Sequence, residues 1–383
     1  MIKKRLHLLR KNFKKFKIDG YVVPKNDEFF SEYSEDKRLE FISNFSGSAG
    51  YAVILKNKNY LFVDGRYTIQ ARIESKTNFK IIEINKILNC NIFKNLNLGI
   101  DPKLFTSNQI QNFFKKHNKI KIIEKNLIDT ISQKKSKKIR PFFSLNEKIT
   151  GENYKKKIKK LTNFLKKNKS DCIFISAPEN VAWLLNIRGH DNPNSPIPNC
   201  HLFLEKTGKF YLIAEKRKIK LLLKEKKIQK NQLIEFDYFE RFIESFLGEK
   251  IIIDEKSCSL FYKKILEKKF QILNIKDPIY SLKAKKNNHE IQNTIRAHIQ
   301  DGAALTKFLY WIKNKNKKKL SEFDAQNKLQ QFRKRNKDYL YPSFNTIAGA
   351  GRNGAIVHYK ATKKNSKKIQ KEDIFLCDSG GQY

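Results

Sequence analysis

Apolar residues in the N-terminal segment recur with the period of a helix. Within residues 1–17 they return every three or four positions, at Ile2, Leu6, Leu9, Phe13 and Phe16. This spacing predicts an amphipathic helix, and the apolar run GYVVP that follows at residues 20–24 predicts a strand. A basic amphipathic start is also compatible with a mitochondrial presequence. The direct continuation into a strand favours the first helix of a folded domain.

The first two thirds of the chain contain the same order of elements twice. Each copy has an apolar strand leading to a loop, then two apolar runs around a polar turn, and then a strand followed by Asp and a helix. The matching segments are 18–29 and 170–185, 51–64 and 201–215, and 98–116 and 251–269. Asp171 lies 152 positions after Asp19, and Asp254 lies 153 positions after Asp101. The nearly constant offset indicates two similar domains.

The repeat divides the chain into three predicted parts. Residues 1–138 and 139–282 are predicted to be tandem α/β domains, each with a mixed sheet flanked by helices. The boundary between them lies near the polar run QKKSKKIRP at residues 133–141. Residues 283–383 form a third part with a different pattern.

In this third part, apolar residues at helical spacing predict one long helix that carries Ile291, Ile295, Ile299, Ala303 and Leu305. Ser321 and Asp324 form a Ser-x-x-Asp capping signal, which predicts the start of a second helix. Two or three strands are predicted from Ser343 onward. Two helices and so few strands do not close a domain, so we expect the incomplete start of an α+β domain.

The formal net charge of +42 is the strongest feature of the composition. Of the 80 basic residues, 67 are lysine and 13 are arginine, and the lysines are spread over the whole chain. Arginine supplies the bidentate contacts that specific nucleic-acid recognition favours. The composition therefore predicts solvated lysines on exposed faces and no specific nucleic-acid partner. A basic nucleic-acid-binding protein stays the alternative, with residues 363–373 as its best local candidate, and a steep salt dependence of binding would favour it.

The cysteines show no Cys-x-x-Cys pair and lie far apart, at Cys90, Cys172, Cys200, Cys258 and Cys377. This spacing argues against a disulfide framework or a zinc knuckle and indicates a reducing, cytoplasmic compartment. No stretch approaches the roughly 18 apolar residues that a membrane span needs. We therefore expect no membrane partner.

The segment GAGRNG at residues 349–354 matches the G-x-G-x-x-G pattern of dinucleotide-binding sites. In such sites the pattern opens a helix whose N-terminus receives the pyrophosphate. Here the β-branched, alternating run AIVHY (355–359) follows, which predicts a second strand and a hairpin, so no nucleotide cofactor is expected. On this strand His358 would share a face with Ile356. A histidine in such a place is more often structural than catalytic, and both interpretations stay open.

An apolar run at residues 374–377 ends at Asp378, and Gly380 and Gly381 follow shortly after it. The run predicts a buried strand on which Cys377 and Asp378 point to opposite faces. A buried carboxylate without compensation is costly. Asp378 would need a cation, a metal ion or backbone N–H donors, and the glycine turn could supply such donors.

The segments around these two residues resemble a known family. YPSFNTIAGAGRNGAIVHYKAT (341–362) and DIFLCDSGGQY (373–383) are similar to the start of the catalytic domain of the Xaa-Pro aminopeptidases (aminopeptidase P), which are pita-bread metallopeptidases. Upstream, residues 282–312 resemble the entry helix of that domain. Residues 180–204 resemble the second creatinase-like domain of the family, and residues 41–54 and 61–72 resemble the first.

The resemblance implies the three-domain type of the family, with two creatinase-like α/β domains before an α+β pita-bread domain. It implies hydrolysis of the bond before a penultimate proline, so that peptides are the substrates. It also implies two divalent metal ions, often manganese, held by two Asp, one His and two Glu. For the full-length protein we expect a cytoplasmic homodimer.

Asp378 falls on the first metal-ligating aspartate of the family. His358 falls on the active-site histidine, which lies beside the substrate and does not bind the metal ions. The second Asp, the His and both Glu of the ligand set have no counterpart in the sequence. We therefore expect a fragment of a longer protein, and we expect these residues alone to hold no metal pair and to be inactive. The alternative is a catalytically dead pita-bread relative that acts as a peptide-binding or scaffold module.

Overall fold

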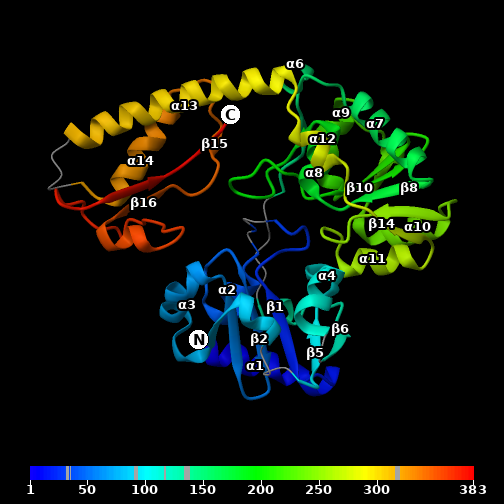
Figure 1. Ribbon diagram of the computed structural model, residues 1–383, viewed down its shortest axis with the longest axis horizontal. Helices are drawn as coiled ribbons and strands as arrows, with labels where there is room; N and C mark the ends of the chain where they lie inside the picture. Colours follow the sequence, from blue (N-terminus) through cyan, green and yellow to red (C-terminus); the bar gives the residue numbers. More distant parts are fainter. Residues whose placement is uncertain (32–33, 35, 90–93, 116–117, 133–138, 315–319) are drawn as a thin grey trace. The chain divides into compact units, whose positions relative to one another are not determined.

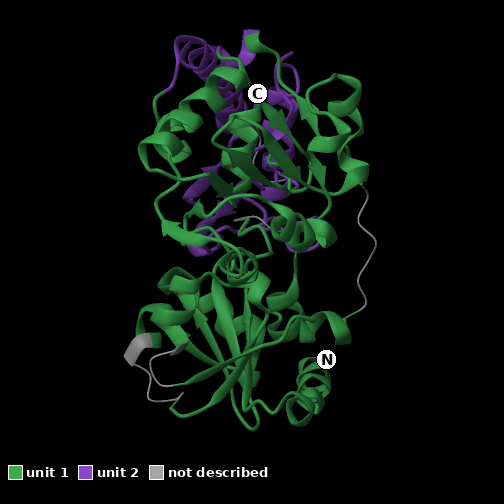
Figure 2. Cartoon of the chain, turned by 90° about the vertical axis from the view of Figure 1, so that its right-hand side faces the viewer, with its two compact units in different colours: residues 1–147, 152–192, 196–285 green, residues 148–151, 193–195, 286–383 purple. Residues whose placement is uncertain are grey.

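The structure, a computed structural model, describes residues 1–31, 34, 36–89, 94–115, 118–132, 139–314 and 320–383. It divides into two compact units, residues 1–147, 152–192 and 196–285 in one and residues 148–151, 193–195 and 286–383 in the other (Figure 2). Cys90 and the predicted boundary at residue 138 lie outside the described residues. The boundaries at 138 and 282 stay predictions.

The first unit contains two six-stranded sheets (Figure 1). The strand order of the first sheet is β4-β3-β2-β1-β5-β6. Its strands are β1 (Gly20–Pro24), β2 (Gly50–Leu55), β3 (Asn59–Val63), β4 (Lys80–Glu83), β5 (Asn97–Ile100) and β6 (Lys119–Ile122). β1, β2 and β3 pair antiparallel, whereas β4, β5 and β6 each pair in parallel with an inner neighbour. The sheet is therefore mixed, as predicted.

The α-helices in this part of the chain are α1 (Ile2–Phe16), α2 (Arg38–Ser43), α3 (Thr68–Ser75), α4 (Ser107–Ile110) and α5 (Leu127–Ile131). α1 confirms the predicted amphipathic helix. Its apolar face is buried, at Ile2, Leu6, Leu9 and Phe13, and its lysines are exposed. Full burial of a large apolar side chain contributes roughly 1.5–3 kcal/mol to stability, so this face anchors the helix to the domain.

The second sheet repeats the order of the first, as β12-β11-β10-β8-β13-β14. Its strands are β8 (Cys172–Ile175), β10 (His201–Glu205), β11 (Phe210–Ile213), β12 (Leu233–Ile234), β13 (Lys250–Ile253) and β14 (Gln271–Asn274). The helices that accompany it are α7 (Tyr154–Lys167), α8 (Pro178–Leu185), α9 (Lys220–Lys224), α10 (Phe239–Ser245), α11 (Leu260–Glu267) and α12 (Ile279–Ala284). A two-stranded ladder joins β7 (Phe143–Ser144) to β9 (Ile187–Arg188). The predicted repeat of two mixed α/β sheets is confirmed.

Two of the repeated aspartates have the same structural task. The carboxylate of Asp19 accepts a hydrogen bond from the backbone N–H of Asn97 at 2.9 Å, just before β5 pairs with β1. The carboxylate of Asp171 accepts one from the backbone N–H of Lys250 at 3.1 Å, at the start of β13. The hydrogen bond from Lys206, followed by backbone N–H bonds, lowers the pKa of Asp171 to about 2. Each aspartate thus ties the first strand of its sheet to the parallel neighbour.

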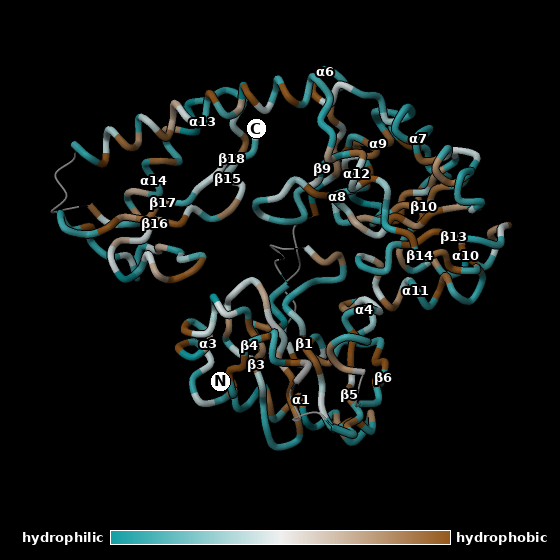
Figure 3. The backbone as a smooth tube through the Cα atoms, in the orientation of Figure 1, coloured by the Kyte–Doolittle hydropathy of each residue, from teal (hydrophilic) through white to brown (hydrophobic). Residues whose placement is uncertain are grey.

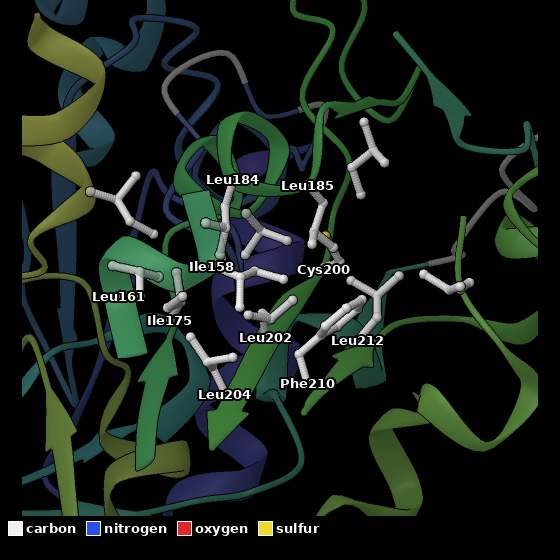
Figure 4. Packing of buried hydrophobic residues seen from close by; sticks show 14 of the residues in the cluster. Ile158, Leu161, Ile175, Leu184, Leu185, Cys200, Leu202, Leu204, Phe210 and Leu212 are labelled. Carbon is white, nitrogen blue, oxygen red and sulfur yellow. The ribbon is translucent and has the colours of Figure 1, made fainter. Parts of the chain in front are cut away.

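The second sheet is covered on both faces. Leu202 and Leu204 of β10 lie in one apolar cluster, whereas Phe203 lies in the other, because successive side chains of a strand point to opposite faces. Figure 4 shows the first cluster, in which Leu161 and Leu184 of the helices pack against the strand residues. Figure 3 shows β10 and β13 in the colour of hydrophobic residues, since both strands contribute side chains to these clusters. Burial on both faces explains why these strands are continuously apolar.

In the described part of the second unit the longest helices are α13 (Asn288–Asn314) and α14 (Glu322–Arg333), and residues 148–150 of the short helix α6 (Glu147–Thr150) also belong to this unit. Its strands are short, and they are β15 (Tyr341–Pro342), β16 (Ile347–Ala350), β17 (Phe375–Asp378) and β18 (Gly381–Gln382). α13 confirms the predicted long helix, and a capping box between Ser321 and Asp324 starts α14 as predicted. In the part of the chain that the structure describes, no helix combines the length and apolarity that crossing a bilayer requires.

The two halves of α13 differ in burial. Phe308 and Ile312 in the C-terminal half pack in one cluster with Leu329 of α14. In the N-terminal half, Ile295 is 48% exposed and Ile299 is 68% exposed. The apolar residues at helical spacing therefore extend over the whole of α13, although the buried ones lie in its C-terminal half.

Candidate catalytic segment

The antiparallel ladder of β16 and β17 carries Asp378, and Ile347 faces Asp378 across it. Cys377 packs against the cluster between the two helices, whereas Leu376 and Asp378 are exposed. Cys377 and Asp378 therefore point to opposite faces, as predicted. The prediction of a buried strand is wrong for β17 as a whole, because only the face that carries Phe375 and Cys377 is covered. The carboxylate of Asp378 stays in water and needs no compensating partner for stability.

His358 does not lie on a strand, and the predicted hairpin is wrong. The residues after β16 form a short 3-10 helix, η10 (Gly351–Ala355). A turn follows, in which the backbone N–H of Tyr359 donates to the carbonyl oxygen of Ile356 at 3.1 Å. His358 lies in this turn, is exposed, and has a left-handed backbone with φ 54°. Such a conformation is uncommon for a residue other than glycine, although histidine adopts it more often than most.

A buried carboxylate, Glu322, holds the segment that contains His358. Glu322 is the first residue of α14 and its exposed fraction is 0%. It accepts hydrogen bonds from Ala350 N (2.7 Å), Lys367 N (2.8 Å), Asn353 Nδ2 (3.0 Å) and Tyr359 Oη (2.8 Å). These contacts fold residues 350–367 back on themselves and override the local strand preference of the run AIVHY. Burial, followed by the hydrogen bond to Glu322, raises the pKa of Tyr359 to about 12.

Sequence reasoning missed Glu322. The residue lies inside the capping signal between Ser321 and Asp324, where a glutamate ordinarily points to solvent and is favoured by the helix dipole. Its donors follow it by about 30 to 45 positions along the chain. The periodicity of apolar residues gives no information about contacts between residues so far apart in the sequence.

Gly351 serves close packing within the same segment. It adopts a left-handed φ of 54°, and a Cβ atom there would lie 2.7 Å from Asp373 Oδ1 and 2.9 Å from Lys367 Nζ. Asp373 and Lys367 form an ion pair at 2.7 Å. The glycine therefore allows η10 to begin directly against this ion pair.

A pair of divalent metal ions needs several ligands around one point. Among the described residues, no group of three or more His, Cys, Asp or Glu is placed to hold a metal ion. Asp378 offers a single carboxylate. Burial raises the pKa of the neighbouring Cys377, which disfavours the thiolate form that binds metals. The described residues therefore do not fit a dinuclear metal centre by themselves.

One small apolar cluster connects the two predicted site residues. Ile347, which faces Asp378 across the ladder, packs in this cluster with Tyr359 and Ala361. Tyr359 directly follows His358 in the chain. The structure thus places an exposed carboxylate, Asp378, and an exposed imidazole, His358, in one α+β unit. Among the described residues, neither side chain belongs to a group of three that could hold a metal ion.

Three family descriptions match the chain in order. Residues 5–128 match a creatinase/prolidase N-terminal domain, and residues 133–290 match a second one. Residues 292–383 match metallopeptidase family M24. The two repeated sheets and the unit with α13 and α14 thus correspond to three known building blocks.

The chain is also similar to known proteins along its whole length. Xaa-Pro aminopeptidase 1 of Dictyostelium discoideum is 34% identical over 423 residues, which cover 100% of this chain and 65% of that protein. A protein of Paracoccidioides brasiliensis (strain Pb03) described as "Probable Xaa-Pro aminopeptidase P" is 33% identical over 416 residues, which cover 99% of this chain and 67% of that protein. The chain thus spans about two thirds of the length of these curated relatives.

Among solved structures, the X-prolyl aminopeptidase of Caenorhabditis elegans has the same fold. The TM-score is 0.90 at 24% sequence identity, and the match covers 100% of this chain and 68% of that protein. The C. elegans protein is described as a cytosolic enzyme with a di-nuclear active site. On the combined evidence of the whole-length relatives and the three matched domains, this chain belongs to the Xaa-Pro aminopeptidase family of M24 metallopeptidases, with two creatinase-like domains at its N-terminal side.

Proposed function

We propose that the protein containing these residues is an Xaa-Pro aminopeptidase, which hydrolyses the bond between the N-terminal residue of a peptide and a penultimate proline. The observation that carries this proposal is the match of the whole chain, rather than of one domain, to proteins of that name at 31–34% identity. Both creatinase-like domains and the M24 part take part in the match. A shared arrangement of all three parts supports a shared substrate class.

In this proposal Asp378 is a metal ligand. A carboxylate oxygen is a ligand that hard divalent cations such as manganese prefer, and β17 presents one at an exposed strand end. We propose two divalent ions, with manganese as the metal, for the whole protein only. The described residues do not form the site alone.

His358 is proposed to bind the substrate. An imidazole N–H can donate a hydrogen bond to the substrate where negative charge develops during hydrolysis, and such a donor lowers the barrier. The exposed position of His358 on a turn, with its neighbour Tyr359 anchored, suits a group that must meet a peptide from solution.

We further propose that the protein acts in the cytosol as a homodimer. The C. elegans enzyme of the same fold is described as cytosolic. Light scattering of the protein after gel filtration tests the dimer, because a monomeric mass at micromolar concentration would contradict it.

The test of the proposed function compares two peptides that differ at one residue. The protein is expressed from its complete reading frame, loaded with Mn²⁺, and incubated with Gly-Pro-Leu and with Gly-Ala-Leu. We expect release of glycine from the proline peptide only, loss of activity with a chelator, and recovery when Mn²⁺ is added back. Equal cleavage of both peptides, or cleavage that a chelator does not affect, would refute the proposal.

A peptide-binding or scaffold role is the second candidate. The observation that favours it is the lack of a group of three metal-binding side chains among the described residues. Saturable binding of Gly-Pro-Leu without hydrolysis, by the protein from the complete reading frame in the presence of Mn²⁺, would support this role over the enzymatic one.

A further inference from the structure

Glu322 is fully buried in the second unit, although removing a carboxylate from water is costly unless the charge is compensated. Its described partners are hydrogen-bond donors, namely two backbone N–H groups, one side-chain amide and one phenol hydroxyl. A carboxylate with this many donors is satisfied as an ion. Among the described residues, the charge is therefore compensated by donors of the segment that contains His358.

The donors lie on both sides of His358. Ala350 ends β16 and Asn353 lies in η10, before the histidine. Tyr359 directly follows the histidine, and Lys367 lies farther along the returning loop. One buried carboxylate thus holds the segment at four points, from the end of a strand through the turn to the loop beyond it.

The backbone of His358 needs such support. Its φ of 54° is a conformation that the local sequence does not favour. Tyr359 is 9% exposed and packs with Ile347 and Ala361, while its hydroxyl donates to Glu322 at 2.8 Å. The residue next to the histidine is therefore anchored at both the ring and the hydroxyl.

We propose that Glu322 is a positioning residue for catalysis: acting through Tyr359, it holds the turn in the conformation that presents the His358 imidazole to a peptide substrate. The inference rests on the proposed function, because it assigns His358 the substrate contact proposed above. Glu322 itself touches neither the substrate nor a metal ion in this role.

The role requires a carboxylate rather than an amide of the same shape. One oxygen of Glu322 accepts from Ala350 N, and the other accepts from Lys367 N. Glutamine at this position would place an NH₂ group against one of these two backbone N–H donors, which leaves a buried donor without an acceptor. Glu322→Gln is therefore a near-isosteric change that loosens the segment without creating a cavity.

The experiment measures kinetics on the protein expressed from its complete reading frame. Glu322→Gln and Tyr359→Phe should each lower kcat for Gly-Pro-Leu by about tenfold or more, with KM changed by less than about twofold and metal content unchanged. Glu372→Gln, an exposed glutamate of the same unit, is the matched control and should match the wild type. In a His358→Ala background, adding Glu322→Gln should cause no further loss, since the positioned group is already gone.

Hydrogen exchange gives a readout that does not depend on activity. In Glu322→Gln, amides between residues 350 and 367 should exchange faster than in the wild type, while amides of the two six-stranded sheets should not change. If the wild type cleaves no proline peptide, the proposed function fails, and the exchange data still decide whether Glu322 holds the turn. Unchanged exchange in Glu322→Gln overturns the proposal, and so does an undiminished effect of this change in the His358→Ala background.

Discussion

We expect His201 to make the second creatinase-like domain sensitive to acid. Its side chain is 2% exposed and lies among aromatic rings, with ring centroids 4.7 Å from Tyr262 and 5.5 Å from Phe174. Nδ1 lies 2.8 Å from the carbonyl oxygen of Ser176, so this nitrogen carries the proton and donates. Nε2 is buried and has no hydrogen-bond partner among the described residues. A second proton on this ring would be a buried charge without an acceptor.

Burial lowers the pKa of His201 from 6.5 to about 4. The folded domain therefore excludes a proton that the unfolded chain binds below pH 6.5, and stability is lost as the pH falls from 6.5 towards 4. The full difference corresponds to roughly 3 kcal/mol, of which about 2 kcal/mol is reached at pH 5. We therefore expect the free energy of unfolding of this domain to fall by about 2 kcal/mol between pH 7 and pH 5 through His201 alone.

The comparison variant is His201→Asn, whose side-chain amide can donate to Ser176 in place of Nδ1 but cannot be protonated. Urea unfolding is followed by the fluorescence of Trp183, which packs against the core of the same domain, in a Trp311→Phe background that removes the other of the two tryptophans. The asparagine variant should be less stable at pH 7 because it fills less of the core. Its deficit relative to the wild type should shrink by about 2 kcal/mol at pH 5.

Carboxylates that titrate elsewhere affect both proteins equally, so they cancel in this difference. A deficit that stays constant within roughly 0.5 kcal/mol between pH 7 and pH 5 would show that His201 is not held neutral by the fold. A deficit that grows as the pH falls would reverse the sign of the argument.

Further predictions concern the second unit. In the protein from the complete reading frame, His358→Ala should lower turnover of Gly-Pro-Leu by roughly 10²-fold with metal content near normal. Asp378→Ala should lose metal and activity together. Loss of metal in the histidine variant would mean that His358 is a ligand. Residues 1–383 alone should bind well under one manganese per chain by elemental analysis, and release of glycine from Gly-Pro-Leu by this chain would contradict the ligand argument. A chain of residues 1–282 should stay monodisperse in light scattering where residues 1–383 associate, because Ile299 is 68% exposed in the longer chain; better behaviour of the longer chain would refute this reasoning.

Local pattern was sufficient for much of the fold. The period of apolar residues predicted α1, and the capping box at Ser321 predicted the start of α14, because both depend on residues within one or two helical turns. The nearly equal offsets from Asp19 to Asp171 and from Asp101 to Asp254 indicated the repeat. In the structure Asp19 ties β1 to β5, and Asp171 ties β8 to β13 in the same way. The family resemblance located Asp378 and His358 without describing their surroundings.

The sequence by itself thus determined the elements, their order and the repeat, since these depend on short-range spacing and on which residues are apolar. Only the tertiary structure decided the surroundings of the candidate site. The β-branched run before His358 favours a strand, yet four hydrogen bonds to Glu322 bend the segment into a 3-10 helix and a turn. The apolar run before Asp378 suggested burial, yet β17 is covered on one face only. In both places contacts between residues distant in sequence outweigh local preference, because a strand preference of at most about 1 kcal/mol is smaller than the cost of leaving a buried carboxylate without its donors.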